Sequence, residues 1–565
     1  MPAPRHRVDP NDIEPAIQAV IGRTLQKRAR GPYSARTDRQ VLEGLERLFA
    51  AKGYRDIRIA SLQRLAGGAS KEMFCFMLHH ADLPEPERLV LRMDPLESII
   101  ETSRQREAAA IMALRGTVPA PEVRYLDEEG EFLGQSGVIT SFVSGVTKPS
   151  DNGGQGVTGI GTNYGSKAAG IAPQFLDNLV AIHNFDWRAA NLPGFSAPSA
   201  YPQQAALWQT NWYVRIWEQT APEQIPLVSL IHRWLRENAP ECHDLCFIHA
   251  DYRMGNFMFD ETTGRMTAVL DWELAHIGDF HEDVAYVTQK LFGLVNDKGQ
   301  FLCCGLFTRE EFLDRLGTFR SHRQSGNPAL LRGGQRLEVG GAHLRFLPAC
   351  RAGGQQPPGH PAELAGIGGT RLSQRHRRLP RRGEEGMTPS IELRLQTMIK
   401  AMSEVILPAI EPGNDLAREQ GQLMIAQLGL IARQWDKAQS YDTLCLRELV
   451  GLARTLAAGA AGGPQTLQAA AAIDAALKQH VPGDRLPAVK AGIDAARAAI
   501  AAAIDGLVRA TEVDSSEAFH AASAKAILDY AAVQAWRDRV WFAAAGMDPE
   551  RADLPSVEAM LAEAG

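Results

Sequence analysis

The 565-residue sequence lacks any uncharged apolar run long enough to cross a membrane as a helix. It has only seven cysteines, and an odd number in so long a chain does not indicate a disulfide framework, so we expect reduced thiols. Residues 1–15 contain no apolar stretch behind their basic residues, so they do not resemble a secretory signal. These features predict a cytoplasmic protein.

A large excess of one charge is also missing, because 60 Lys and Arg stand against 66 Asp and Glu, for a formal net charge of -6. This balance provides no overall basic surface for nucleic acid. Apolar residues make up 45% and charged residues 22% of the chain, which excludes wholesale disorder. The length allows three or four domains of usual size. We therefore expect a multi-domain protein that binds neither nucleic acid nor a membrane.

The apolar spacing changes along the chain. Residues 1–52 contain two stretches with apolar residues three and four apart, which predicts two N-terminal helices. Residues 53–145 contain short apolar and β-branched runs broken by turns, with one helical stretch near 100–114. This pattern predicts an α+β lobe of four or five strands with its helix between the third and the fourth. Residues 146–318 begin with mostly helical segments and continue with strand-like pieces.

The composition changes abruptly over residues 319–386. This segment holds 12 Arg and 13 Gly but no Lys, Asp, Tyr or Trp, and its apolar periodicity is lost. We interpret it as out-of-frame translation of a GC-rich gene, with Met387 as the original start of a neighbouring reading frame. The alternative is an Arg/Gly-rich linker that binds anions. Residues 387–565 are Ala-rich and helical by period, which predicts an all-α bundle for packing or for a protein partner.

The strongest chemical signal is the segment FIHADYRMGNFMFD, followed by VLDWE. His249, Asp251 and Asn256 lie in one short loop, and Asp271 follows the apolar run MTAVL. A carboxamide and a carboxylate at the ends of a hairpin can converge on Mg²⁺, which prefers oxygen ligands, and Asp251 is then left to face a substrate hydroxyl. The spacing matches the kinase layout, in which one Asp orients the nucleophile while Asn and a second Asp hold metal.

With these motifs, residues 30–317 resemble the aminoglycoside phosphotransferase family, which also includes choline and homoserine kinases. The nearest likeness is to bacterial phosphotransferases and to the kinase-like domains that precede acyl-CoA dehydrogenase modules. The resemblance implies a two-lobed, protein-kinase-like α+β fold and ATP- and Mg²⁺-dependent phosphorylation of a small-molecule hydroxyl. It implies Asp251 as the catalytic base, Asn256 and Asp271 as Mg²⁺ ligands, and His249 as a scaffold of the loop. Asp283 resembles the carboxylate that braces this loop.

The N-terminal lobe supports the match. Gly67, Gly68 and Ser70 lie between two expected strands, where backbone N–H groups can approach phosphate, although a plain hairpin turn also fits them. Arg92 on the third strand and Glu107 on the helix would form the cation–carboxylate pair that holds nucleotide phosphates in kinases. The family commonly has Lys at the strand position. Arg is permanently charged and forks onto phosphate, so it keeps the role with a changed geometry.

Several other residues keep more than one interpretation. The segment Thr140–Phe142 resembles the hinge between the lobes, whose backbone would bind adenine. Arg253 either neutralises the transferred phosphate or pairs with a neighbouring carboxylate, and Glu273 contacts substrate, metal or neither. His183 is interpreted as a packed helix histidine rather than a catalytic group.

The terminal helices that complete the acceptor pocket in the family would fall in residues 319–386. If that segment is out of frame, these helices are missing. The chain is then an active kinase, an impaired nucleotide-binding domain fused to an interaction bundle, or a kinase in which the bundle replaces the lost helices. The sequence does not identify the acceptor.

Overall fold

A computed structural model of the chain separates it into two compact units. Unit 1 comprises residues 1–220 and 239–355, and unit 2 comprises residues 221–238 and 356–565. The structure describes residues 12–28, 36–65, 72–82, 84–93, 102–150, 162–220, 224–321, 390–411, 415–545, 548 and 551–563. Most of the Arg/Gly-rich segment lies outside these ranges, so both interpretations of it stay predictions.

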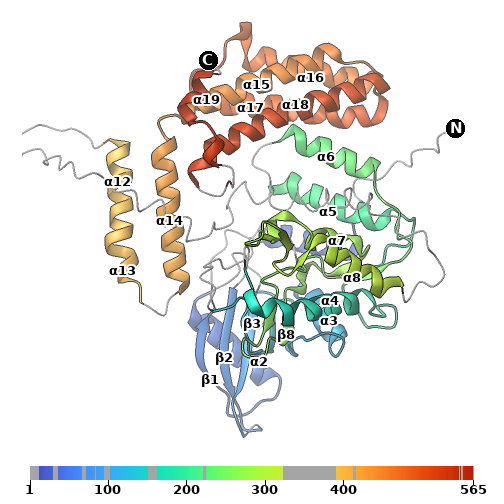
Figure 1. Ribbon diagram of the computed structural model, residues 1–565, viewed down its shortest axis with the longest axis vertical. Coiled ribbons are helices and arrows are strands. Elements are labelled where there is room, and N and C mark those ends of the chain that lie inside the picture. The colour runs from blue at the N-terminus through green and yellow to red at the C-terminus, as the bar shows by residue number, and fades with distance from the viewer. Residues whose placement is uncertain are drawn as a thin grey trace, which may run out of the picture. The chain divides into compact units, whose positions relative to one another are not determined.

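Unit 1 contains the α+β lobe that the sequence predicted (Figure 1). Helices α1 (Pro15–Arg28) and α2 (Asp38–Ala51) precede an antiparallel five-stranded sheet of order β1-β2-β3-β5-β4. The strands are β1 (Arg58–Arg64), β2 (Glu72–His79), β3 (Glu87–Met93), β4 (Val123–Asp127) and β5 (Gly137–Ser141). Helix α3 (Arg104–Leu114) follows β3 and precedes β4, as expected, and begins four residues later than the sequence suggested.

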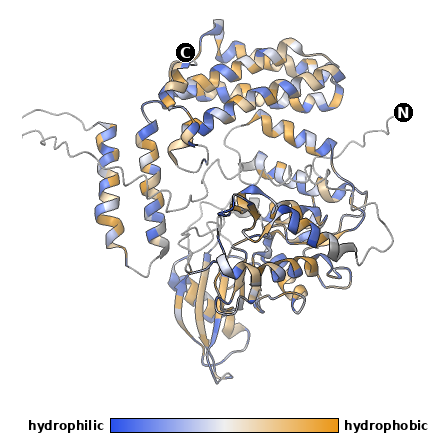
Figure 2. Ribbon diagram, viewed as in Figure 1, coloured by the Kyte–Doolittle hydropathy of each residue, from blue (hydrophilic) through white to orange (hydrophobic). Residues whose placement is uncertain are grey.

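The core of this lobe follows from the two periods in its sequence. In β2 and β3 every second residue is apolar and buried, which places one face of the sheet inward. Residues three and four apart on α2 provide the opposing surface. Figure 2 shows the hydrophobic colour concentrated along these strands. The buried core residues of the lobe are Val41, Leu45, Leu48, Phe49, Phe74, Phe76, Leu78, Leu89, Leu91, Met93, Leu133 and Ile139.

The second part of unit 1 combines helices with short paired strands. Helices α4 (Ala168–His183) and α5 (Gln204–Thr220) come first. Two antiparallel pairs follow, β6 (Cys246–Ile248) with β9 (His276–Gly278) and β7 (Phe257–Phe259) with β8 (Met266–Val269).

Further elements complete unit 1. The short 3-10 helix η2 spans Trp272–Leu274, and helix α7 spans His281–Val287. After them come a small three-stranded sheet over residues 294–308 and helix α8 (Arg309–Ser321). The expected α+β class, with a β-rich first lobe and a mainly helical second lobe, is confirmed.

Unit 2 is all-α and includes one helix from the middle of the sequence. Its C-terminal part begins with helices α12 (Ile391–Ala401) and α13 (Leu407–Ala409), which are joined by a π-helical turn. Six further helices follow. These are α14 (Asp415–Gln434), α15 (Ala438–Gly459), α16 (Pro464–His480), α17 (Lys490–Asp514), α18 (Glu517–Phe542) and α19 (Val557–Glu563). The added helix is α6 (Pro226–Glu237), which the sequence placed in the C-lobe of the kinase-like region.

Helix α6 is held in unit 2 by both apolar and polar contacts. Leu230 belongs to the same buried core as the residues of α15, α16 and α17. Arg233 is buried and donates from Nη1 to Thr511 Oγ1 at 2.5 Å. Arg236 lies 3.0 Å from a carboxylate oxygen of Glu512. Residues more than 270 positions apart in the sequence therefore fold as one structure.

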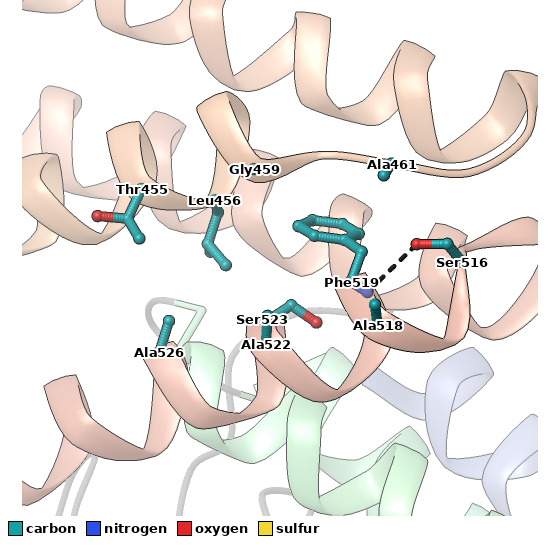
Figure 3. A pocket seen from close by; sticks show the side chains of 10 residues that line it. All are labelled: Thr455, Leu456, Gly459, Ala461, Ser516, Ala518, Phe519, Ala522, Ser523 and Ala526. Carbon is teal, nitrogen blue, oxygen red and sulfur yellow. Dashed lines mark hydrogen bonds between the residues drawn. The ribbon is translucent and has the colours of Figure 1, made fainter.

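Unit 2 also contains a pocket of about 350 Å³ between α15 and α18 (Figure 3). Its lining consists of Thr455, Leu456, Gly459, Ala461, Ser516, Ala518, Phe519, Ala522, Ser523 and Ala526. The Ser516 hydroxyl accepts the Phe519 N–H and thereby caps α18. The side chains of this lining include no carboxylate, imidazole, amine or thiol. None of the described helices is long and apolar enough to cross a membrane.

Candidate active site

The loop and hairpin that the sequence singled out form one local structure. The loop of residues 249–256 follows β6 and leads into β7, and Asp271 comes two residues after β8. The Leu270 N–H donates to Asn256 O at 2.8 Å, so Asn256 and Asp271 stand at the same end of the β7–β8 hairpin. Asp271 has a left-handed backbone, with φ 68°, which is rare for residues other than glycine and concentrates at functional sites.

Asp283 braces the loop from the first turn of α7. Its fully buried carboxylate accepts the backbone N–H of His249 at 3.0 Å and that of Ala250 at 2.8 Å, and it lies 3.0 Å from His183 Nε2. Burial alone would raise the pKa of Asp283, but hydrogen bonds and the neighbouring imidazoles outweigh burial and hold this pKa below its ordinary value. The geometry agrees with the bracing role expected of Asp283 and with the packed role expected of His183.

His249 is built into the loop as a neutral scaffold. Its Nε2 lies 3.0 Å from Leu270 O, and its Nδ1 accepts the N–H of Asp251 at 3.2 Å. Because Nε2 faces a carbonyl acceptor and Nδ1 faces an N–H donor, the ring carries its proton on Nε2. Complete burial lowers the pKa of His249 below its ordinary value, and this effect outweighs the nearby carboxylates, which would raise it. Both ring nitrogens are therefore used inside the protein, and neither is placed to exchange a proton with a substrate.

The Asp251 carboxylate is held by two neighbours on its own loop. Arg253 Nε donates to Oδ1 at 2.8 Å, and Asn256 Nδ2 donates to Oδ2 at 2.7 Å. Burial opposes the Arg253 charge, but the Asp251 carboxylate raises the pKa of Arg253 above its ordinary value. Of the two interpretations of Arg253, the structure shows the salt bridge to a carboxylate. These contacts fix the orientation of the Asp251 carboxylate.

Tyr286 on α7 is a further neighbour of Asp251 that the sequence analysis did not identify. Its buried hydroxyl interacts with the Asp251 carboxylate. Burial and that negative charge raise the pKa of Tyr286 well above its ordinary value, so the phenol stays protonated. The signal for it was weak, because a Tyr in an amphipathic helix looks like a core residue.

Arg92 links the two lobes through an ion-pair network. Its Nη1 pairs with Glu107 on α3, the partner that the sequence suggested. Glu107 is almost completely buried. Arg92 Nη2 lies 2.7 Å from Asp271 Oδ1 and 3.7 Å from Glu273 Oε2. One planar guanidinium thus connects strand β3, helix α3 and the segment after β8, which a single ammonium group could not do with the same geometry.

Arg104 extends this network and was missed in the sequence. It is fully buried, pairs with Glu107 through Nη1 and lies 3.0 Å from Glu273 Oε2 through Nη2. Glu273, whose role was left open, is therefore a partner of Arg104 and Arg92. The pairing joins residues 169 positions apart, and no local pattern could have indicated it.

The proposed nucleotide-binding backbone is described in part. Gly67, Gly68 and Ser70 lie outside the described residues. Thr140 belongs to β5, where its register partners are Val90 and Val123. The Phe142 N–H donates to Arg88 O at 3.1 Å, and the Phe142 ring lies 3.7 Å beneath the Arg88 guanidinium.

A divalent cation fits the donor atoms at the end of the hairpin. Among the described residues, no group of three or more His, Cys, Asp or Glu side chains is arranged to hold a metal ion. The hairpin instead offers the Asn256 amide and the Asp271 carboxylate. Two protein oxygens completed by waters and phosphate are an ordinary Mg²⁺ environment. The Asn256 amide nitrogen points at Asp251, so its oxygen is the atom left for the cation.

Comparison with known proteins gives the same assignment for this region. The model of the phosphotransferase enzyme family matches residues 61–300. Acyl-CoA dehydrogenase family member 11 of Gallus gallus is 34% identical over 118 residues, which are 21% of this chain and 15% of the relative. Family member 10 of Mus musculus is 27% identical over 203 residues, which are 35% of this chain and 18% of the relative. The chain spans between 14% and 24% of the length of the curated relatives it matches.

Among solved structures, the chain is similar to an aminoglycoside phosphotransferase in complex with AMP-PNP and hygromycin B, with 17% identity and a TM-score of 0.36 over 56% of this chain and 91% of that one. It is also similar to choline kinase from Cryptosporidium parvum, with 13% identity and a TM-score of 0.34 over 51% of this chain and 82% of that one. The likeness to the phosphotransferase enzyme family is therefore that of residues 61–300, which its model matches.

Proposed function

We propose that the domain transfers the γ-phosphoryl group of ATP to a hydroxyl group of a small molecule. The observation that carries this proposal is the arrangement around Asp251. Its carboxylate is oriented by Arg253 and Asn256, while Asn256 and Asp271 share one end of the hairpin. A carboxylate that faces the acceptor, beside two oxygen ligands for a cation, is what phosphoryl transfer requires.

In this proposal Asp251 acts on the acceptor hydroxyl. Its two oxygens receive N–H donors from the loop, which fixes the carboxylate plane before the acceptor arrives. The hydroxyl proton is transferred to Asp251 as the hydroxyl oxygen bonds to the γ-phosphorus. The bond from that phosphorus to the β–γ bridging oxygen breaks, and ADP leaves. Because the transition state of phosphoryl transfer is loose, positioning and charge stabilisation supply most of the rate enhancement.

Arg92 and the hairpin hold the nucleotide. Arg92, fixed by Glu107, would bind the α- and β-phosphates, and Asn256 and Asp271 would hold Mg²⁺, which neutralises charge on the phosphates when bound. Arg92 lies 2.7 Å from Asp271 in the structure. Nucleotide binding would exchange this ion pair, so that Arg92 turns to phosphate and Asp271 to the cation. For adenine, residues after Phe142 are better placed than Thr140 or Phe142, because those two already use backbone groups in the sheet.

The test is a screen for ATP-dependent phosphorylation with the full chain and a panel of hydroxylated small molecules. The panel includes amino alcohols, aminoglycosides, hydroxy acids and hydroxyacyl thioesters, the last because several relatives are named as acyl-CoA dehydrogenase family members. We expect at least one product whose formation needs both ATP and Mg²⁺. Products that form equally well with Asp251→Asn would contradict the proposal.

The ion pair between Arg92 and Asp271 also favours a second candidate. If this pair persists when nucleotide is present, Asp271 is not available to a cation, and the domain binds nucleotide without transferring phosphate. Unit 2 would then provide the functional surface, as a helical module for a protein partner. AMP-PNP affinity that is independent of Mg²⁺, with no transfer to any acceptor, would support this candidate over the first.

A further inference from the structure

A buried ion pair joins the start of the chain to helix α3. Glu14, just before α1, and Arg106, on α3, both have side chains 3% exposed. Arg106 Nη1 lies 2.7 Å from Glu14 Oε1, which also accepts the Ser196 N–H at 2.8 Å. Neither residue belongs to a motif of the proposed phosphotransfer site. A buried ion pair with good geometry constrains both segments that contribute to it, because breaking it would leave a buried charge without its partner.

Arg106 also contacts the segment that follows Asp271, the proposed metal ligand. Its Nη2 donates to Ala275 O at 2.8 Å, four residues after Asp271, and its Nη1 also donates to Gly194 O at 2.8 Å. The guanidinium lies 4.4 Å from the centre of the Phe195 ring. One side chain of α3 is therefore fixed on several sides, and one of those contacts comes from the N-terminal segment.

The N-terminal segment also packs beneath the catalytic loop. Ile13, Ile17 and Ile21 share one buried cluster with residues of β6, of the loop that carries Asp251, and of η2. Those partners include Ile248, Ala250 and Leu274. The N-terminal segment therefore shares a core with β6 and with the loop that carries Asp251, through Ile13, Ile17 and Ile21, and it contacts α3 through Glu14.

The position of α3 matters because Glu107 is the residue next to Arg106. Glu107 is 1% exposed and pairs with Arg92 on β3 and with Arg104 on α3 itself. A displacement of α3 would carry Arg104 along with Glu107 but would break the pair between Glu107 and Arg92. In kinases the corresponding lysine–glutamate pair must be in place for activity, and the position of its helix controls that.

We propose that Glu14 is a positioning residue for nucleotide binding. It acts through Arg106 to set α3, and thereby the hold of Glu107 on Arg92. The effect on nucleotide binding rests on the proposed function, whereas the contact between Glu14 and Arg106 does not. The N-terminal segment is then part of the phosphotransferase machinery, although residues 12–28 precede the region that the family model matches.

The test uses the full chain with Glu14→Gln, which keeps an oxygen acceptor for Ser196 and removes the charge. The matched control is Glu448→Gln in unit 2, where Glu448 pairs with Arg537 at 3.1 Å. Hydrogen exchange over residues 104–114 should become faster in Glu14→Gln and stay unchanged in the control. AMP-PNP affinity in the presence of Mg²⁺ should fall about three- to thirtyfold in Glu14→Gln. In the control it should stay within about twofold of the wild-type value.

A double-mutant cycle separates positioning from a general loss of stability. If Glu14 acts through Glu107, Glu14→Gln should cost little further affinity in a Glu107→Gln background, because neighbouring effects on one pathway are not additive. Unchanged exchange of α3 in Glu14→Gln, or fully additive losses in the cycle, would overturn the inference. If no form of the chain binds AMP-PNP, the proposed function fails, and the exchange of α3 alone then decides whether Glu14 positions this helix.

Discussion

Arg92 shows how one side chain can serve two states of a site. Its guanidinium connects Glu107 with Asp271, and Glu273 lies 3.7 Å from the same nitrogen that contacts Asp271. A guanidinium can fork between carboxylates or onto a phosphate, whereas an ammonium is a point charge. The residue at this position therefore determines how strongly Asp271 is held in this structure.

Replacing Arg92 by Lys should release Asp271 without removing the positive charge. A lysine can keep the pair with Glu107 but cannot also reach Asp271 with the same planar fork. We expect the Mg²⁺ concentration that gives half-maximal AMP-PNP binding to fall about two- to tenfold, as for the loss of one charge-assisted hydrogen bond partly screened by solvent. Titration of Mg²⁺ at fixed AMP-PNP measures this. An unchanged or higher Mg²⁺ requirement would show that the ion pair does not compete with the cation.

Asp283 is the residue on which the shape of the catalytic loop depends. Asp283→Ala would leave the N–H groups of His249 and Ala250 without their buried acceptor. Each such orphan costs about 1–3 kcal/mol, so we expect a loss of stability of about 3–5 kcal/mol in unit 1. Chemical denaturation followed by hydrogen exchange of residues 246–259 tests this. The exposed Asp297→Ala is the matched control, and similar effects of the two variants would contradict the bracing role.

At the level of elements, the local signals of the sequence predicted much of unit 1. The alternation in β2 and β3, the spacing in α2 and the polar loop after β6 depend on neighbours in sequence, so the strands, α3 and the catalytic hairpin could be predicted. Partners distant in sequence could not be predicted. The pairing of Arg104 with Glu273 was recognised only from the fold. Helix α6 has an amphipathic pattern that fits any apolar surface, so its place among the C-terminal helices required the structure.

Helix α6 gives unit 2 a specific pH dependence. Burial, helped by the nearby Arg236 charge, lowers the pKa of His232 to about 3, against about 6.5 in an unfolded chain. Between these values the unfolded chain binds a proton that the folded helix does not bind, so stability falls as the pH falls below about 6.5. The slope contributed by one such group is on the order of 1 kcal/mol per pH unit.

The variant His232→Leu should remove this contribution. Hydrogen exchange of α17, measured at several pH values between 7 and 4.5 and corrected for intrinsic rates, reports the opening of unit 2. We expect the opening free energy to decline less steeply with falling pH in His232→Leu than in the wild type. Equal slopes in the two proteins would mean that His232 does not titrate differently in the folded and unfolded chains.

For the whole molecule, the chain order and the packing order differ. Helix α6 lies in sequence between α5 and β6 of unit 1 but packs in unit 2 against α17 and α18. The C-terminal helices, which the sequence suggested as a separate bundle, therefore share a core with a helix encoded more than 150 residues earlier. Whatever the origin of residues 319–386, the segments before and after them form common structure.

This shared core predicts how a cut chain behaves. If a specific protease site is introduced within residues 322–389 and cleaved, the N-terminal piece still carries α6 and the C-terminal piece still carries α17 and α18. We expect the two pieces to elute together in size-exclusion chromatography at micromolar concentration. Substituting Leu230→Asp and Arg233→Asp should separate them, because both side chains are buried in unit 2. Separate elution of the unsubstituted pieces would show that α6 does not hold them together.

The most direct test of the account compares the wild type with Asp251→Asn. Two quantities are measured for each protein: the rate of γ-phosphoryl transfer to an accepted hydroxyl compound, and the affinity for AMP-PNP. Asparagine keeps the size of the side chain and cannot take the hydroxyl proton, a step worth about 10²- to 10⁴-fold in rate. The account predicts that transfer falls by that factor while AMP-PNP affinity stays within about threefold, since Arg92, Asn256 and Asp271 remain. Transfer within about threefold of the wild-type rate would contradict it.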